Sequence, residues 1–302
     1  MALSTFLRIS LLVQVVAGTL LARAVLPESF GWIAAALVGV LLPAVVTALV
    51  LAIELIIGAL VDARQPSASP LAVARVWFGE TLCSLRAFAW RQPFGAAFAE
   101  AAITHDPKRP AVLLIAGYVC NRAVWKPLID SRLLADCNVA TVNIEPVFGP
   151  IDGYADQIHA AVGRLRAASG AAQAILVCHS MGGIAARAYL RQHGDAAGSR
   201  VITLASPHHG TIFGRLGHGA NARQMARGSA YLHTLAGVET LARRRRFVCI
   251  ATADDNLVVP RSSPLLPDAE HRVIDGVGHL ALLEDHRAWA LIVRAIREAP
   301  SA

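Results

Sequence analysis

A serine at position 180 lies where a nucleophile could be presented to a substrate. Residues Ala174–Cys178 form an apolar run typical of a buried strand, and Ile184–Gln192 has a helical pattern, so Ser180 falls in the tight turn between them. A serine on such a turn is held in a strained backbone conformation that lifts its hydroxyl out of the sheet. Gly182 and Gly183 leave room for that turn. The pattern predicts an alcohol nucleophile, and an ordinary turn serine is the alternative.

Residues in two segments that follow Ser180 in the sequence could activate this hydroxyl. A resting hydroxyl is a poor nucleophile and needs a base within hydrogen-bond reach, oriented by a third group. Asp255 follows the strand-like run Phe247–Ala251, and His279 comes directly after Gly278. We expect His279 to act as the base and Asp255 as the orienting acid. Asp254 stays a rival for the acid, because adjacent carboxylates cannot be separated without geometry; a loop cap is the alternative for the pair.

These residues depend on a regular framework that begins near residue 111. From there on, short apolar runs alternate with helical patterns. Near-continuous apolar strands separated by helices predict a mostly parallel sheet covered by helices on both faces, which is the α/β class. The predicted strands are Val112–Ala116, Val139–Ile144, Ala174–Cys178, Val201–Ala205, Phe247–Ala251 and Arg272–Ile274.

The segment around Ser180 resembles the nucleophile turn of the α/β-hydrolase superfamily, and its surroundings are similar to those of bacterial lipases and esterases. The family pattern is G-x-S-x-G, whereas this sequence has Cys178 in place of the first glycine. The segment T-A-D-D-N-L-V at 252–258 resembles the family's S-x-x-D-x-x-V, with Thr252 in place of serine. The segment P-H-H-G-T at 207–211 resembles the P-H-x-G-T of lipases. The chain order Ser, Asp, His is also that of the family.

The resemblance also implies an oxyanion hole. Ala116-Gly117-Tyr118 is similar to the family's H-G-x turn after the first core strand, with Ala116 in place of histidine. In the family, one backbone N–H of this turn and the one after the nucleophile donate to the developing oxyanion. These donors correspond to Tyr118 and Met181 here. The resemblance implies no metal and no organic cofactor.

The N-terminal region predicts a membrane hairpin. Leu3–Leu26 is apolar apart from two arginines and a glutamine, and Phe30–Val61 is a longer apolar stretch. About 20 residues cross a hydrocarbon core of about 30 Å, so each stretch is long enough to span. A cleaved signal peptide is the alternative for the first stretch, although no convincing cleavage site precedes the second. Glu54, within the second stretch, could pair with Arg8 or Arg23, or snorkel towards a helix end.

Positive charges follow the second apolar stretch. The positive-inside rule places such a flank in the cytoplasm, and two crossings then put both termini on that side. We therefore expect a bacterial-type inner-membrane protein with a cytoplasmic catalytic domain. The arginines concerned are Arg64, Arg75, Arg86 and Arg91.

The chain is expected to divide into three parts. Residues 1–65 form the hairpin, 66–110 a linker with connecting helices, and 111–302 the catalytic domain, with a cap or lid insertion near 208–244. Apolar residues of the insertion could line an acyl channel or could equally be ordinary core. They are Leu216, Met225, Tyr231, Leu232 and Leu235. His208 could support the wall of the site or simply pack.

The overall composition narrows the class of protein. Hydrophobic residues make up 55% of the chain, above the roughly 45–50% of a soluble domain. The formal net charge is +7, but aromatic residues make up only 6%, without a stacking pattern, which argues against nucleic acid as a partner. The five cysteines are odd in number and scattered, so they indicate buried free thiols rather than disulfides or a zinc site.

Together these features predict a membrane-anchored serine hydrolase that cleaves carboxylic esters, with a lipid or acyl ester as substrate. An acyltransferase or thioesterase could use the same three residues. A non-catalytic α/β-hydrolase-like protein that binds a lipid or a partner is a further alternative, given the substitutions at Cys178 and Ala116. A transporter subunit would draw on the hairpin, but two spans offer little room for a pathway unless several chains assemble.

Overall fold

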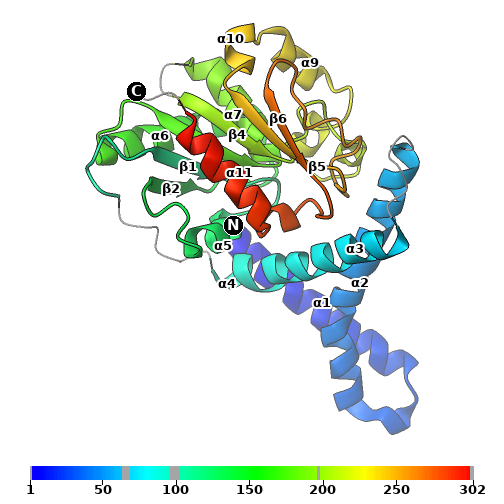
Figure 1. The fold of residues 1–302 in the computed structure, drawn as a ribbon. Helices are drawn as coiled ribbons and strands as arrows, with labels where there is room; N and C mark the ends of the chain where they lie inside the picture. The colour runs from blue at the N-terminus through cyan, green and yellow to red at the C-terminus, as the bar shows by residue number, and fades with distance from the viewer. Residues whose placement is uncertain (1, 63–68, 96–102, 196–197, 300–302) are drawn as a thin grey trace.

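The computed structural model of the protein describes residues 2–62, 69–95, 103–195 and 198–299. Its framework is a sheet with the strand order β2-β1-β3-β4-β5-β6, in which every neighbouring pair is parallel (Figure 1). The strands are β1 (Ala111–Ile115), β2 (Asn138–Val142), β3 (Ala174–His179), β4 (Gly198–Leu204), β5 (Phe247–Thr252) and β6 (Glu270–Ile274). The predicted parallel sheet is confirmed, and each predicted strand overlaps an observed one.

Alternate residues of the strands enter two different cores. Side chains along a strand point to opposite faces of the sheet. Leu113 and Ile115 of β1 therefore pack on one face, whereas Val112 and Leu114 pack on the other. All four are fully buried. Burial on both faces explains why an inner strand such as β1 is a continuous apolar run and does not alternate with polar residues.

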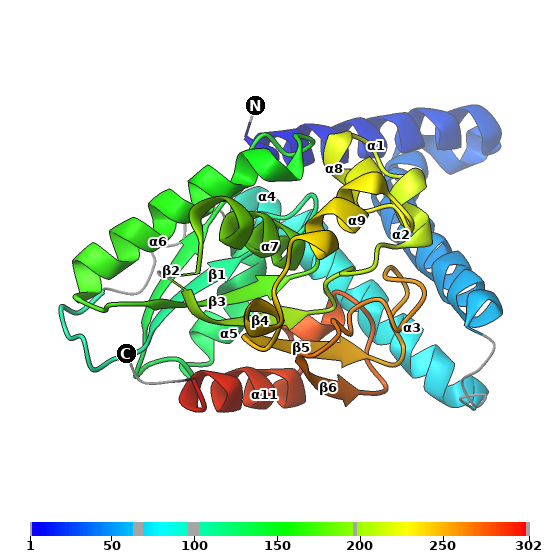
Figure 2. The ribbon, with the colours of Figure 1, turned by 90° about the horizontal axis from the view of Figure 1, so that it is seen from above.

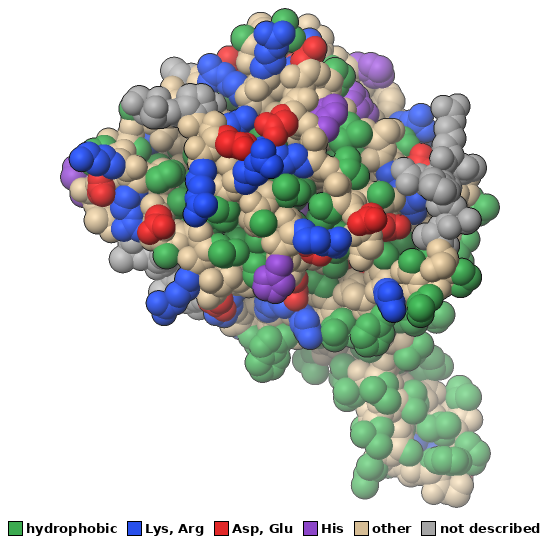
Figure 3. All heavy atoms as spheres, in the orientation of Figure 1, with side chains coloured by type: hydrophobic (Ala, Val, Ile, Leu, Met, Phe, Trp, Pro, Cys, Tyr) green, Lys and Arg blue, Asp and Glu red, His purple; other side chains and the backbone are tan. Residues whose placement is uncertain are grey.

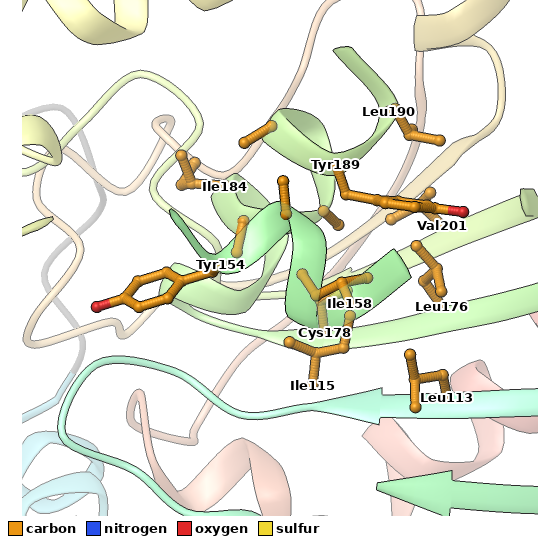
Figure 4. Packing of buried hydrophobic residues seen from close by; sticks show 14 of the residues in the cluster. Leu113, Ile115, Tyr154, Ile158, Leu176, Cys178, Ile184, Tyr189, Leu190 and Val201 are labelled. Carbon is orange, nitrogen blue, oxygen red and sulfur yellow. The ribbon is translucent and has the colours of Figure 1, made fainter. Parts of the chain in front are cut away.

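Helices cover both faces of the sheet. Figure 2 shows α6 (Ala155–Ser169) and α7 (Met181–His193) on one face and α11 (His286–Arg297) on the other. Ile158 of α6 and Leu190 of α7 belong to the same buried cluster as strand residues such as Leu176 (Figure 4). Shorter helical segments of the domain are η3 (Arg122–Trp125), α5 (Lys126–Asp130), η4 (Ile151–Tyr154) and η6 (Ala281–Leu283).

The segment between β4 and β5 contains short helices. A buried ion pair connects it to α7. Arg187 of α7 donates from Nε and Nη2 to Glu239 at 2.6 and 2.8 Å, and both side chains are buried. Arg187 also donates to the carbonyl of His208 at 2.9 Å. A buried pair of this kind holds the segment firmly, because removing one partner leaves an uncompensated charge. The helices of the segment are η5 (Ile212–Arg215), α8 (Ala220–Gln224), α9 (Ala230–Gly237) and α10 (Leu241–Arg244).

The N-terminal hairpin consists of α1 (Leu3–Val25), η1 (Glu28–Phe30) and α2 (Gly31–Val61). Figures 1 and 3 show it projecting from the rest of the molecule with apolar side chains on its surface. Among the described residues, two helices are long and apolar enough to cross a membrane, and both belong to this hairpin. Length and composition are the whole of this test, and a signal sequence would also pass it.

Small residues let the two helices of the hairpin approach closely. A Cβ built on Gly39 would lie 2.1 Å from Thr19 Oγ1 and 2.7 Å from the carbonyl oxygen of Val15. A Cβ on Gly18 would lie 3.1 Å from Gly39 Cα. Glycines at a helix crossing are typical of packing in membranes, where apolar surface alone gives no driving force for association.

A bent helical segment joins the hairpin to the sheet. It consists of α3 (Pro70–Leu85), the π-helical η2 (Arg86–Arg91) and α4 (Gln92–Phe94). Ser69 caps its N-terminus by accepting the amide of Ala72, with Pro70 at the first helical position. Trp77 Nε1 donates to the carbonyl of Ala48 in α2 at 2.7 Å, whereas Cys83 packs in the core below the strands. The segment thus contacts both α2 and the sheet domain.

Candidate active site

Ser180 lies in the turn between β3 and α7, where the strand ends. Its φ of 53° and ψ of −124° fall in a region that residues other than glycine rarely adopt. The surroundings leave no space for larger neighbours. A Cβ on Gly182 would lie 2.8 Å from the carbonyl oxygen of Ile115, and a Cβ on Gly183 would lie 2.2 Å from Ser206 Oγ. The strained strand–turn–helix geometry expected for Ser180 is therefore present.

The three residues predicted to act together converge at this turn. His279 Nε2 lies 3.0 Å from Ser180 Oγ. His279 Nδ1 lies 3.0 and 3.2 Å from the two carboxylate oxygens of Asp255. All three residues are buried. A hydrogen-bonded series from carboxylate through imidazole to hydroxyl allows a base to take the proton of an attacking alcohol.

The two adjacent carboxylates, Asp254 and Asp255, point to different partners. Asp255 is fully buried, and its Oδ1 also accepts the amides of Leu257 at 2.9 Å and Val258 at 2.7 Å. Asp254 instead accepts the amide of Gly276 at 2.6 Å through Oδ2. The geometry therefore assigns the contact with the imidazole to Asp255 and makes Asp254 the cap of a turn.

Charge around the imidazole favours its protonated form. Burial acts to lower the pKa of His279, but the charge and hydrogen bond of Asp255, together with the carboxylate of Glu80, raise it above its ordinary value. Next to it, burial and the neighbouring His279 lower the pKa of His179 to about 3. His179 is therefore neutral near pH 7, and its Nε2 lies 3.3 Å from the carbonyl oxygen of His279.

The amides expected to form an oxyanion hole belong to residues beside Ser180. Met181 is the first residue of α7, and the amides of a first helical turn have no acceptor within the helix. Tyr118 follows Gly117, and a Cβ on Gly117 would lie 2.9 Å from Ser180 Cβ. Tyr118 also lines the same cavity as the serine. The role of both amides stays a prediction.

Three polar residues that had no predicted part in the site hold the loop of His279 in place. The amide of His279 donates to Asn256 Oδ1 at 3.0 Å, and Asn256 Nδ2 donates to Glu54 of α2 at 2.7 Å. Glu80 of α3 accepts the amides of Leu280 at 2.8 Å and Ala281 at 2.9 Å. We call Glu54, Asn256 and Glu80 the His279 support.

This arrangement corrects the expectation for Glu54. The carboxylate was expected to pair with Arg8 or Arg23 or to snorkel, but it accepts a hydrogen bond from Asn256. Arg8 donates to the carbonyl of Pro93 at 2.7 Å, and Arg23 lies over the ring of Trp32. The partner of Glu54 was missed because the two residues are 202 positions apart, so no local pattern joins them.

A cavity of about 290 Å³ opens beside Ser180 and His279. One wall belongs to the α/β domain, and the opposite wall belongs to the hairpin and the bent segment. The residues from α2 are Val46, Thr47, Val50, Leu51 and Glu54, and those from α3 and η2 are Glu80, Ser84 and Phe88. The serine therefore faces an apolar helix that was predicted to lie in a membrane.

Of the two alternatives for the apolar residues of 208–244, acyl channel or ordinary core, the packing favours core, since none of them lines this cavity. Leu216 is 81% exposed, whereas Met225, Leu232 and Leu235 are buried in the core cluster beside α7. Their apolar pattern reflected packing against the sheet domain. His208 likewise packs: it is buried against the ring of Phe247, and its Nε2 lies 3.2 Å from Thr203 Oγ1.

The cysteines are free thiols, and four of the five are buried, as expected; Cys137 is partly exposed. Cys178, at the position of the family's first glycine, packs in the core cluster between sheet and helices. Within the described residues, no three His, Cys, Asp or Glu side chains come together in a way that could hold a metal ion.

Solved structures with a similar fold are lipases, esterases and other hydrolases. Lipase B of Aspergillus fumigatus superposes with a TM-score of 0.59 at 18% identity, over 67% of this chain and 56% of the fungal one. The mature lipase BlEst2 of Bacillus licheniformis gives 0.57 at 15% identity, over 65% of this chain and 96% of the bacterial one. This chain therefore matches little more than half of the fungal lipase.

No protein-family model matches the chain, and no curated protein does. At these identities the likeness to solved structures shows the fold, and the chain has the α/β-hydrolase fold. This likeness in fold carries no information on the substrate, because one fold supports many reactions.

Proposed function

We propose that the protein is a membrane-anchored serine hydrolase that cleaves carboxylic esters, with a lipid or acyl ester as substrate. The observation that carries this proposal is the series of contacts from Asp255 through His279 to Ser180, at 3.0 Å on each side of the imidazole. The contacts lie beside a cavity large enough for an acyl group. The hydrolases of like fold support the same class of reaction.

The reaction follows from the positions of these atoms. His279 Nε2 takes the hydroxyl proton as Ser180 Oγ bonds to the ester carbonyl carbon, and the amides of Tyr118 and Met181 donate to the oxygen that becomes negative. The proton then passes to the leaving alcohol as the carbon–oxygen bond of the ester breaks. Water, giving a proton to His279, then bonds to the acyl carbon. The bond from that carbon to Ser180 Oγ breaks, His279 returns the proton to Oγ, and the carboxylic acid leaves. Asp255 stabilises the imidazolium in both halves.

Membrane anchoring by α1 and α2 belongs to the proposal. Both ends of the hairpin lie beside the α/β domain, since Leu3 of α1 and Leu51 of α2 each line a pocket together with residues of that domain. This supports two crossings with both termini on one side. Arginines that follow α2 favour the cytoplasmic side of a bacterial-type inner membrane. The proposed protein has three parts: the hairpin (1–65), the connecting segment (66–110) and the catalytic domain (111–302). The 208–244 insertion is the cap of the catalytic domain.

The orientation can be measured separately from the chemistry. A reporter that is active only in the cytoplasm, fused to the C-terminus, should be active, and the same fusion to an exported reporter should be silent. The opposite pair of results would place the catalytic domain outside the cytoplasm.

A covalent probe tests the chemistry. The full-length protein in detergent should react with a fluorophosphonate, whereas Ser180→Ala should not, because the probe bonds to the activated serine oxygen. A panel of oxygen esters, thioesters and phospholipids, assayed with both proteins and with added alcohol acceptors, separates hydrolysis from thioester cleavage and acyl transfer. A folded wild type that remains unlabelled, or equal labelling of Ser180→Ala, would overturn the proposed function in favour of a non-catalytic binding protein.

A further inference from the structure

The hairpin also encloses a second cavity that the catalytic residues do not reach. It has a volume of about 220 Å³ and lies between α1, α2 and the bent segment. Its lining from the hairpin comprises Leu7, Ser10, Leu11, Gln14, Pro43 and Thr47. All of these residues lie in the two helices that are apolar enough to cross a membrane.

The second cavity adjoins the cavity of Ser180. Thr47 of α2, Ser84 of α3 and Phe88 of η2 line both. These three side chains therefore stand at the boundary between the two spaces. A substrate whose carbonyl lies at Ser180 would reach the second cavity past these three side chains.

The chemistry of the second cavity suits an aliphatic chain. The polar groups of the hairpin lining are already engaged there: the Thr47 hydroxyl donates to the carbonyl of Pro43 at 2.8 Å, and Gln14 Nε2 donates to Ser10 Oγ at 3.0 Å. Apart from Ser84 at the boundary with the first cavity, the remaining lining is apolar and consists of Leu7, Leu11, Pro43, Leu85, Phe88 and Ala89. No ionisable side chain lines this cavity. A head group with charges would therefore lose its solvation without gaining a partner.

The position of the cavity argues for an occupant that comes from the bilayer. Between Leu7 and Leu26 and between Gly31 and Leu51, each helix covers about 30 Å at 1.5 Å per residue, which matches the hydrocarbon core. The outer face of α2 beside the cavity is apolar and open, with Val45 51% and Leu49 58% exposed. An acyl chain dissolved in the membrane is thus at the depth of the cavity before it binds.

We propose that the second cavity, between α1, α2 and η2, holds the acyl chain of a medium- to long-chain ester that enters from the bilayer. This inference rests on the proposed hydrolase function and names its substrate class. The acyl chain is assigned rather than the alcohol because it stays bound to Ser180 through both half-reactions, whereas the alcohol departs after the first. The site belongs to the hairpin, outside the α/β domain.

A matched pair of neighbouring leucines tests this assignment. Leu11 lines the second cavity, whereas Leu12 is 64% exposed on the outside of the same helix. The full-length protein in detergent is assayed with p-nitrophenyl esters of four, eight, twelve and sixteen carbons. Leu11→Trp should lower the ratio of kcat/KM for sixteen carbons to that for four carbons at least tenfold, because the indole occupies the space of several methylenes. Leu12→Trp should leave this ratio unchanged.

A second, smaller substitution in the same cavity keeps the test valid if Leu11→Trp does not fold. Ser10→Leu should lower the same ratio in the same direction by a few-fold. If neither Leu11→Trp nor Ser10→Leu changes the ratio, the acyl chain does not lie there and the inference is wrong. The same variants are also assayed with esters of one short acid and alcohols of four to sixteen carbons. If they change the preference for alcohol length but not for acyl length, the cavity binds the leaving group and the inference is wrong. Ser180 labelling by fluorophosphonate in these variants shows that such a result leaves the proposed hydrolase intact.

Discussion

The hairpin and the α/β domain are both rich in aliphatic residues, yet they bury them differently. In β1 every side chain is less than 3% exposed, whereas Ile33 and Leu37 of α2 are 81% and 61% exposed. The domain covers its apolar residues with its own helices, whereas the hairpin leaves many of them exposed, as the proposed membrane anchoring requires. Apolar composition alone therefore does not distinguish a segment that is buried within the protein from one that is left exposed by it.

The two regions also contribute different parts of the candidate site. The α/β domain supplies Ser180, His279 and Asp255, the proposed nucleophile, base and acid, whereas the hairpin and the bent segment supply a wall of the cavity and two members of the His279 support. If this division is right, changes in the domain should abolish the chemistry, and changes in the hairpin should alter its efficiency, selectivity or stability.

The largest effect is expected from the acid in the domain. Asp255→Asn should lower kcat by about 10⁴-fold, because the amide cannot hold the imidazole in the productive tautomer. Asp254→Asn, which keeps an acceptor for the amide of Gly276, should change kcat less than threefold. Both are measured with a short-chain ester and fluorophosphonate labelling. Equal losses in the two variants would remove the distinction drawn between these carboxylates.

A pH-dependent loss of stability is expected from Glu80. Burial raises the pKa of this carboxyl from 4.5 to about 7, although the amide hydrogen bonds oppose the rise. The folded protein therefore binds this proton more tightly than the unfolded chain does. The resulting stabilisation is fully present below pH 4.5 and is lost as pH rises through 7, by about 3 kcal/mol in all.

Glu80→Gln removes this titration and keeps one oxygen as acceptor. The melting temperature of the wild type should fall relative to that of Glu80→Gln between pH 5 and pH 9, measured in one detergent. A difference in melting temperature that is the same at both pH values would show that Glu80 does not titrate in this range.

A smaller effect on catalysis is expected where the hairpin meets the domain. Glu54→Leu leaves Asn256 without its carboxylate partner and loosens the loop of His279, so kcat should fall on the order of tenfold. Glu28→Leu removes the same charge from the exposed end of the hairpin and should have no effect. A fall in kcat for both variants would point to membrane insertion rather than to the position of the base.

The smallest effect is expected from the contact within the hairpin. Gly39→Ala places a Cβ against Thr19 and should destabilise the protein by about 1–3 kcal/mol. Gly79→Ala in α3 meets no atom within 4 Å and should stabilise it by up to about 1 kcal/mol through helix propensity. Thermal unfolding in detergent measures both. A stabilising Gly39→Ala would show that the two helices do not pack this closely.

Much of the fold and the three residues that meet in the candidate site could be predicted because their signals are local. Most of the strands are short apolar runs, and Ser180 lies between a strand and two glycines at which the packing leaves no room for a side chain. Asp255 and His279 each follow a strand, so the common direction of parallel strands brings them to one edge of the sheet.

The hairpin's part in the site could not be predicted, because it depends on contacts between distant segments. Glu80 and Leu280 are 200 positions apart, and nothing near either residue indicates the other. For the apolar residues of the 208–244 insertion, an acyl channel and ordinary core stayed open as alternatives, because the periodicity of apolar residues indicates burial but not the neighbour that buries them. Leu235, for example, is buried in the core, but the same apolar spacing in the sequence would also fit a residue that lines an acyl channel.

The support of His279 joins a part of the chain that is synthesised early to one that is synthesised late. Glu54 leaves the ribosome some 200 residues before Asn256 is synthesised. The hydrogen bond between them can therefore form only after α2 and most of the sheet domain have been made. Under the proposed function, the position of His279 therefore depends on two parts of the chain that are made at different times and must meet. A nascent chain that has not yet made this contact is expected to be a weaker esterase than the complete protein.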